Sequence, residues 1–218
     1  MNTNEAKFAE LQKEWFTARR QVHENVQHWE DRFEELREEE NKLRDEGRWI
    51  HGRDDFLGVL GWPRDELAHS RIIKWLLDPC ARHGLGTRVL AGVIQKVFGS
   101  SYHVPRLERA VADCEVSLVD GRLDIVVDAP ELYLVIENKV DADETGQCAY
   151  YAEHLRADAR CILLSPDGRE ATATNKFKPM RYADLAEILQ RVLAEVAIGA
   201  SGRRVAEDYL QTLKREFS

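Results

Sequence analysis

The sequence has 218 residues, of which 44% are hydrophobic and 32% are charged. That length is enough for one sizeable core, or for one core with an appendage. The net charge of −8 argues against binding to nucleic acid through a general basic surface, but it leaves room for a local basic groove beside an acidic metal site.

The cysteines and the hydropathy favour a reducing, aqueous compartment. Cys80, Cys114, Cys148 and Cys161 are widely spaced and form no CxxC pair, which argues against a structural zinc site or a disulfide framework. The first residues are polar and charged, unlike a signal peptide. No apolar run approaches the roughly 18 residues that would suggest a membrane span. We therefore expect a soluble cytoplasmic protein with no membrane partner.

Residues 5–46 are predicted to form one long helix, because they contain neither proline nor glycine. Apolar residues recur every three or four positions and resume after one four-residue step, which is a stuttered heptad stripe. Two interpretations stay open: a helix packed on its own domain, or a coiled-coil arm that pairs with another chain. The arm predicts a homodimer or a helical partner through residues 5–46. The stripe comprises Phe8, Leu11, Trp15, Ala18, Val22, Val26, Trp29, Phe33, Leu36 and Leu43.

The remainder of the chain predicts an α/β domain over residues 49–218, behind an arm at 1–48. A glycine-containing connector leads from Trp49 to Pro63, and tight turns separate the strands. The order of elements indicates a mixed central sheet flanked by helices. Helices are predicted at 63–78, 87–99, 144–155, 182–196 and 202–217, and strands at 110–118, 122–128, 132–140 and 161–165.

Three charged residues stand out in the second and third predicted strands. Asp124 lies in the apolar run GRLDIVVD, where a carboxylate is costly unless it is paired or binds a metal. Side chains alternate along a strand, so Glu137 and Lys139 share a face, about 6.5–7 Å apart. A hairpin about residues 129–131 would place Asp124 next to Glu137. Two such carboxylates suit Mg²⁺, and the lysine can orient a water or add positive charge near a phosphate.

This arrangement resembles the PD-(D/E)xK nuclease superfamily. Asp124 is followed, after twelve residues, by Glu137-Asn138-Lys139 at the end of a hydrophobic strand. Leu123 stands where the family's name places a proline. The runs ELAHSRIIKWLLDP, HGLG, GRLDIVV and IENKVDADE are similar to one bacterial subfamily in particular. The resemblance covers roughly residues 60–215 and leaves the N-terminal helix outside.

Two further features match the same family in the expected order. Gln147 and Tyr151 resemble the Q-x-x-x-Y of the RecB-like branch, on the helix after the motif strand, and at i,i+4 they face the same way. Glu66 resembles the acidic residue on the first core helix that completes the metal site. Each feature is common by itself, and their order along the chain is what favours the family.

The resemblance implies a restriction-endonuclease-like αβββαβ core and Mg²⁺-dependent hydrolysis of phosphodiester bonds, with Mn²⁺ able to substitute. DNA is favoured over RNA as the substrate, the products would carry 5′-phosphates, and for a bacterial member phage defence is the natural pathway to test. Lys139 would position the attacking water, and Gln147 and Tyr151 would orient Lys139 or the scissile phosphate. The implied metal ligands are Asp124, Glu137, the backbone carbonyl of Asn138, and Glu66 directly or through water.

Four basic residues are weaker candidates for contact with nucleic acid. Arg122 lies just before Asp124 and would either touch a phosphate or pair with an acid. Lys176, Lys178 and Arg181 surround Phe177 in TNKFKPMR, a segment that we expect to be a solvated loop.

Two alternatives to a nuclease remain. The first is a catalytically silent nuclease fold that acts as a binding or assembly module through its helical arm, which the acidic charge favours. The second is a coiled-coil interaction protein with an unrelated α/β domain. The second alternative predicts no carboxylates gathered between the second and third strands.

Overall fold

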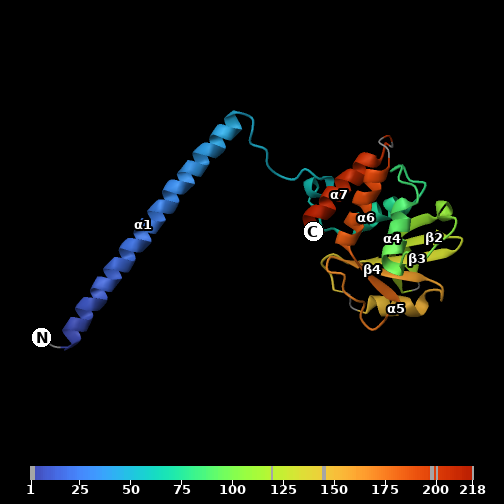
Figure 1. Cartoon of the computed structure of the whole chain (residues 1–218). Helices are drawn as coiled ribbons and strands as arrows, with labels where there is room; N and C mark the ends of the chain where they lie inside the picture. Colours follow the sequence, from blue (N-terminus) through green and yellow to red (C-terminus); the bar gives the residue numbers. More distant parts are fainter. Residues whose placement is uncertain (1–2, 119, 144–145, 197–198, 200, 218) are drawn as a thin grey trace. The chain divides into compact units, whose positions relative to one another are not determined.

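A computed structural model describes residues 3–118, 120–143, 146–196, 199 and 201–217. The chain divides into two compact units, Met1–Gly52 and Arg53–Ser218. Helix α1, Thr3–Asp45, accounts for most of the first unit and confirms the predicted long N-terminal helix (Figure 1). Among the described residues, no helix is both long and apolar enough to cross a membrane.

Helix α1 is held by contacts along its own surface. Arg32 pairs with Glu35 at 2.8 Å and Arg44 with Glu40 at 2.6 Å, at the i,i+3 and i,i+4 spacings that join neighbours on a helix. The large apolar side chains of the stripe from Leu11 to Leu36 are exposed within this unit. A stripe of this length leaves much apolar surface in water. Helices gain most of their stability from packing such a face, and little from propensity alone.

The second unit is built on one five-stranded sheet in the order β1-β2-β3-β4-β5. The first three strands are antiparallel, and β3, β4 and β5 are parallel, which confirms the predicted mixed sheet. The strands are β1 (Val111–Leu118), β2 (Gly121–Ala129), β3 (Leu132–Asn138), β4 (Arg160–Ser165) and β5 (Phe177–Arg181).

Strand β5 corrects one expectation, because residues 174–181 were expected to be a solvated loop. Phe177 and Met180 are buried against the sheet and the helices, while Lys178 and Pro179 are exposed. Pro179 lacks a backbone N–H for a ladder, and an edge strand tolerates this because one of its sides is unpaired. The proline and the charged residues led to the prediction of a loop where the chain forms a short edge strand.

Helices cover both faces of the sheet (Figure 1). One face packs against α3, α4, α6 and α7 in a large core that includes Ile125, Leu134 and Ile162. The opposite face packs against α5 in a smaller core that includes Val126 and Val135. The helices are α2 (Phe56–Val59), α3 (Glu66–Leu77), α4 (Arg88–Phe98), α5 (Gln147–His154), α6 (Tyr182–Glu195) and α7 (Arg203–Phe217), with a 3₁₀ turn at Leu107–Arg109.

Local sequence explains where α3 begins and where α3 and α4 end. Asp65 caps α3 by accepting a hydrogen bond of 2.7 Å from the backbone N–H of Ala68. Pro79 follows soon after the last residue of α3, where a helix cannot continue through it. Gly99 ends α4 with a φ of 96°, a conformation that favours glycine.

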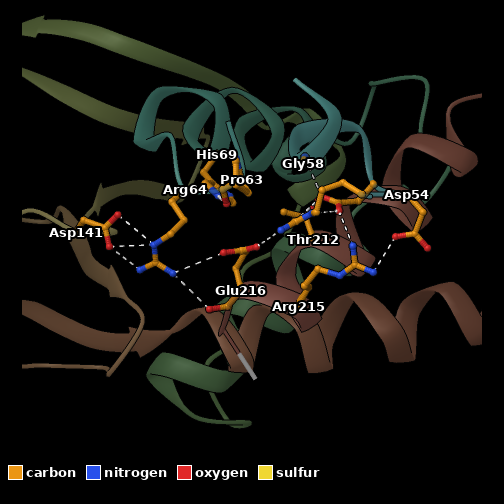
Figure 2. Close-up of polar contacts among 11 residues, drawn as sticks. Asp54, Gly58, Pro63, Arg64, His69, Asp141, Thr212, Arg215 and Glu216 are labelled. Carbon is orange, nitrogen blue, oxygen red and sulfur yellow. Dashed lines mark hydrogen bonds and ion pairs between the residues drawn. The ribbon is translucent and has the colours of Figure 1, made fainter. Parts of the chain in front are cut away.

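A buried acid ties the end of the chain to the start of this unit (Figure 2). Asp55 is 1% exposed and accepts hydrogen bonds from Arg53 (2.7 Å), from Thr212 on α7 (2.8 Å) and from the N–H of Gly58 (3.0 Å). Arg53 also donates to Glu216 at 2.6 Å. These contacts lower the pKa of Asp55, first through the hydrogen bond from Arg53.

We predict that Asp55→Ala lowers the free energy of unfolding by about 2–4 kcal/mol, because Thr212, Gly58 and Arg53 lose their common partner. Because the pKa of Asp55 is lowered, its carboxylate stabilises the fold at pH values above the ordinary pKa of 3.8. That stabilisation is lost as the pH falls below 3.8 toward the pKa in the folded protein. Urea unfolding between pH 3 and pH 7 should show a shallower acid dependence in the variant. Asp54→Ala is the matched control, because the Asp54 side chain is 78% exposed. Equal losses in the two variants would contradict the assignment.

Candidate functional site

Strands β2 and β3 separate where the conspicuous charges lie. Their pairing reaches Ile125 opposite Ile136, so the next position places Asp124 across from Glu137. The backbone N–H of Asn138 donates to Oδ2 of Asp124 at 2.8 Å. The carboxylate thus satisfies a backbone donor at the point where the ladder ends, and the predicted neighbourhood of Asp124 and Glu137 is present.

Glu137 is a buried carboxylate without hydrogen-bond donors. The residue is 0% exposed, and neither Oε1 nor Oε2 has a hydrogen-bond partner among the described residues. The ammonium of Lys139 lies 2.9 Å from Oε1 as an ion pair, without the geometry of a hydrogen bond. Burial, with the nearby charge of Asp124, raises the pKa of Glu137 to about 7. A buried group of this kind is costly unless something else satisfies it.

The other two charges are shifted by the same surroundings. Burial raises the pKa of Asp124, although the hydrogen bond from Asn138 opposes this. Burial acts to lower the pKa of Lys139, but the charges of Glu137, Asp124 and Glu66 outweigh it, and the net shift is upward. Lys139 therefore stays a cation at neutral pH, which makes it a source of positive charge and a poor proton acceptor.

Glu66, the first residue of α3, reaches the segment that follows β3. Its Oε1 accepts hydrogen bonds from the backbone N–H groups of Val140 (2.8 Å) and Ala142 (3.5 Å). Arg64 holds the same segment through Asp141, with Nε 3.0 Å from Oδ1 (Figure 2). Glu66 therefore lies beside the carboxylate pair, as expected, but one of its oxygens is engaged by backbone donors.

The side chain of Asn138 joins three elements. Its Nδ2 donates to the carbonyl oxygen of Glu66 at 2.9 Å and to Oγ of Ser70 at 3.0 Å. The hydroxyl of Tyr182, at the start of α6, donates to its Oδ1. The sequence motif predicted a role only for the backbone carbonyl of Asn138, and contacts with Ser70 and Tyr182 were not predicted. The signal was present, since an asparagine closing a buried strand needs partners for its amide.

Gln147 and Tyr151 lie together on α5 as the spacing predicts. Nε2 of Gln147 donates to the Tyr151 hydroxyl at 2.9 Å, and that hydroxyl donates to the carbonyl oxygen of Arg122 at 2.7 Å. The N–H of Arg122 in turn donates to the hydroxyl at 3.3 Å. Tyr151 is 1% exposed. In this structure the pair therefore braces the start of β2, two residues before Asp124.

Glu115 is an additional carboxylate that sequence reasoning missed. The register of β1 and β2 pairs Cys114 with Ile125 on one side and Val116 with Leu123 on the other, which puts Glu115 across from Asp124. Its φ of 61° is in the left-handed region, where residues with a Cβ are strained. Oε2 of Glu115 pairs with Arg122 at 2.9 Å, so Arg122 faces an acid, one of its two predicted partners.

The basic residues of 174–181 lie elsewhere. Nζ of Lys176 donates to the carbonyl oxygen of Ala152 (3.3 Å), near the C-terminus of α5, and to that of Arg156 (3.2 Å), just after α5. Arg181 pairs with Asp184 at 2.8 Å, where α6 begins. Lys178 is exposed on β5. The contacts of Lys176 and Arg181 are those of helix ends, and they do not link these residues to Asp124 and Glu137.

The donor set suits a hard cation held by two carboxylates. Within the described ranges, no three His, Cys, Asp or Glu side chains converge closely enough to hold a metal ion. Asp124 and Glu137 nevertheless lie side by side, and the orphaned oxygens of Glu137 provide buried, negatively charged acceptors of the type that Mg²⁺ and Mn²⁺ prefer. The residues present therefore fit such an ion. Glu66 lies nearby, but its Oε1 already accepts hydrogen bonds from the backbone.

Comparison with known proteins gives one family. A family model described as the PD-(D/E)XK nuclease superfamily matches residues 54–211, which is most of the chain and leaves α1 outside. Comparisons with curated proteins and with solved structures give no significant match.

We predict that, with chelator present, the free energy of unfolding falls as the pH rises from about 5 to 8. The raised pKa of Glu137 means that the folded chain holds this proton more tightly than the unfolded chain, whose value is 4.5. Glu137→Gln should remove most of that fall and stabilise the protein at pH 8 by about 1–3 kcal/mol. The control is Asp128→Asn, an exposed acid on β2. A pH dependence that the Gln variant leaves unchanged would refute the assignment.

We predict that Tyr151→Phe destabilises the second unit by about 1–3 kcal/mol, because the backbone groups of Arg122 lose their partner. Tyr150→Phe is the matched control. Its hydroxyl is also buried but has no hydrogen-bond partner among the described residues, so its removal should be neutral or slightly stabilising. Chemical unfolding of the two variants makes the comparison. A Tyr151→Phe protein of unchanged stability would argue against a bracing role.

Proposed function

The chain belongs to the PD-(D/E)XK nuclease superfamily, and from this premise we propose that it hydrolyses phosphodiester bonds of nucleic acid in a Mg²⁺-dependent reaction, with DNA as the preferred substrate. The observation that carries the proposal is the carboxylate of Glu137, fully buried, without a hydrogen-bond partner among the described residues, and beside both Asp124 and Lys139. A purely structural core would not retain such a group unsatisfied.

Asp124 and Glu137 would hold the divalent ion, with the backbone carbonyl of Asn138 as a further oxygen ligand. When bound, Mg²⁺ or Mn²⁺ would lower the pKa of water and stabilise negative charge on a phosphate. Glu66 has one oxygen on the N–H groups of Val140 and Ala142, which favours an indirect role through water over direct ligation.

Lys139 supplies the positive charge of the site. Its raised pKa keeps the ammonium protonated, so it would orient the attacking water and stabilise developing charge on the phosphate, and it would not accept a proton. Glu137 pairs with its ammonium, and the backbone N–H of Lys139 donates to the carbonyl oxygen of Leu164 on β4. Gln147 and Tyr151 would act by positioning β2, and so Asp124, through the backbone of Arg122.

The contribution of the basic residues is smaller. Arg122 has an exposed side chain whose partner is Glu115, and a phosphate could exchange with that acid. Lys178 is exposed on β5, whereas Lys176 and Arg181 have partners at helix ends. Arg169 is a better-placed cation, because it donates to the carbonyl oxygen of Ala142 beside the site. We propose a cytoplasmic setting and assembly through the arm at 1–48.

The test is cleavage of matched single-stranded DNA, double-stranded DNA and RNA with Mg²⁺, with Mn²⁺ or with chelator. We expect metal-dependent cleavage of DNA, and a loss of about 100-fold or more in Asp124→Asn, Glu137→Gln and Lys139→Met. Asp128→Asn is the control, since its side chain lies on the exposed part of β2. Full activity in any one of the three site variants would overturn that residue's assignment.

A second candidate function rests on the arm and the acidic net charge of −8. In that case the fold is a silent module that binds or assembles. Calorimetric titration with Mn²⁺ separates the two functions, with Glu137→Gln as reference. Metal binding without cleavage of any substrate would support an intact but silent site. The absence of both binding and cleavage would contradict the metal site itself.

A further inference from the structure

The apolar stripe of α1 is straight and exposed. Its residues from position 11 to position 36 fall within an arc of about 80° at 100° per residue. They recur at eleven-residue intervals, as in 11, 22 and 33, a repeat of about 3.67 residues per turn that drifts only slowly around a helix of 3.6 residues per turn. Large apolar side chains on this part of α1 are 48% to 69% exposed: Leu11, Trp15, Phe16, Val22, Val26, Trp29, Phe33 and Leu36.

The stripe also carries hollows that a facing side chain could enter. One is lined by Val26, Trp29, Phe33 and Leu36, with two charged neighbours. Another is lined by Val22 and Val26 with Arg19 and His23. Side chains of a second helix insert into such hollows when two helices pair.

Most of the stripe between Trp15 and Leu36 has the same spacing when it is followed from either end. Reflection about a point between residues 25 and 26 exchanges position 22 with 29, 18 with 33, and 15 with 36, all of which are stripe positions, whereas Leu11 is exchanged with Glu40 and Val26 with Asn25. Two copies of α1 laid antiparallel about that point therefore match stripe residue with stripe residue at positions 15, 18, 22, 29, 33 and 36. A two-fold interface needs a self-complementary surface of this kind.

Side-chain sizes favour the antiparallel arrangement over a parallel one. Antiparallel pairing sets Ala18 opposite Phe33 and Val22 opposite Trp29, so a small residue meets a large one in these two layers. Parallel pairing in register would stack Trp29 on Trp29 and Ala18 on Ala18. Because the distance between two helices depends on the side chains at the contact, those layers would demand different separations.

Charge favours the same arrangement. Residues 30–46 carry nine acidic and four basic side chains, net −5, while residues 7–24 carry three acidic and four basic ones, net +1. A parallel pair would bring the two acidic halves together. An antiparallel pair faces each acidic half with the mildly basic half of its partner, and it brings Arg19 beside Glu30 of the other copy at two places.

We propose that α1 pairs antiparallel with α1 of a second copy of this chain, with the two-fold axis between residues 25 and 26. The chemistry of the surface specifies the occupant, since its layers and its charge halves complement themselves. This proposal does not depend on catalysis, so dimerisation and cleavage can succeed or fail separately.

The oligomeric state of the full chain is the first test. Sedimentation equilibrium should give a dimer, and Trp29→Glu should raise its dissociation constant by about 100-fold or more, because a charge would replace a central aromatic in both halves. Thr17→Glu is the matched control, since it adds the same charge at an exposed position on the opposite side of the helix. A monomeric wild type, or a dimer unaffected by Trp29→Glu, would overturn the proposal.

Cysteine cross-linking tests the orientation. In a Cys80→Ser, Cys114→Ser background, chains with Ala18→Cys are mixed with chains of different mass that carry Phe33→Cys. Antiparallel pairing brings these positions together, so mild oxidation should give the mixed dimer and little of either self-linked product. Efficient self-linking of each variant alone would indicate a parallel pair and refute the antiparallel arrangement.

Charge reversal tests the register. Arg19→Glu should weaken the dimer by about 5- to 30-fold, because two pairs become repulsive, and Glu30→Arg added to the same chain should restore it. The two positions lie about 16 Å apart along one helix, so neither rescue within a chain nor rescue in a parallel pair is expected. A double variant as weak as Arg19→Glu would contradict the register.

Discussion

Asn138 is fully buried where β3 ends, and its backbone and side-chain polar atoms form hydrogen bonds with three other elements. The backbone N–H holds Asp124 on β2, Nδ2 holds the start of α3, and Oδ1 accepts from Tyr182 on α6. Glu137 precedes this residue and Lys139 follows it, so the position of both charges depends on it. A buried amide that uses its hydrogen-bonding capacity in this way fixes geometry, since each lost partner would cost about 1–3 kcal/mol.

These rigid contacts surround a buried carboxylate, Glu137, whose charged form is electrostatically unfavourable at that position. Burial and the charge of Asp124 act against ionisation of Glu137, while the same carboxylates stabilise the ammonium of Lys139. Hydrogen bonds from α3, α5 and α6 surround these residues yet leave the Glu137 oxygens without a donor. The surrounding contacts therefore hold a buried carboxylate beside the ammonium of Lys139 without giving it a hydrogen bond, a costly electrostatic arrangement that is more common at functional sites than in ordinary cores.

The sequence predicted the elements that follow simple periodicity and missed contacts between distant ones. Strands β2 and β3 were predictable because their apolar runs are long and end at turns, and their register brought Asp124 beside Glu137. The spacing of Gln147 and Tyr151 predicted their contact, but the backbone of β2 as the common partner depends on the fold. Tyr182 lies 44 residues from Asn138, and no local pattern announces that pairing. Glu115 lies across from Asp124 because of the register of β1 on β2, and the turn between those strands did not by itself reveal it.

The two units use their apolar residues in opposite ways. In Arg53–Ser218 they close two cores around a sheet. In α1 they form an exposed stripe, and long helices in water draw most of their stability from packing. If α1 pairs antiparallel, its two C-terminal ends lie about 60 Å apart. Each Arg53–Ser218 unit would then be attached at its own end of the paired helices.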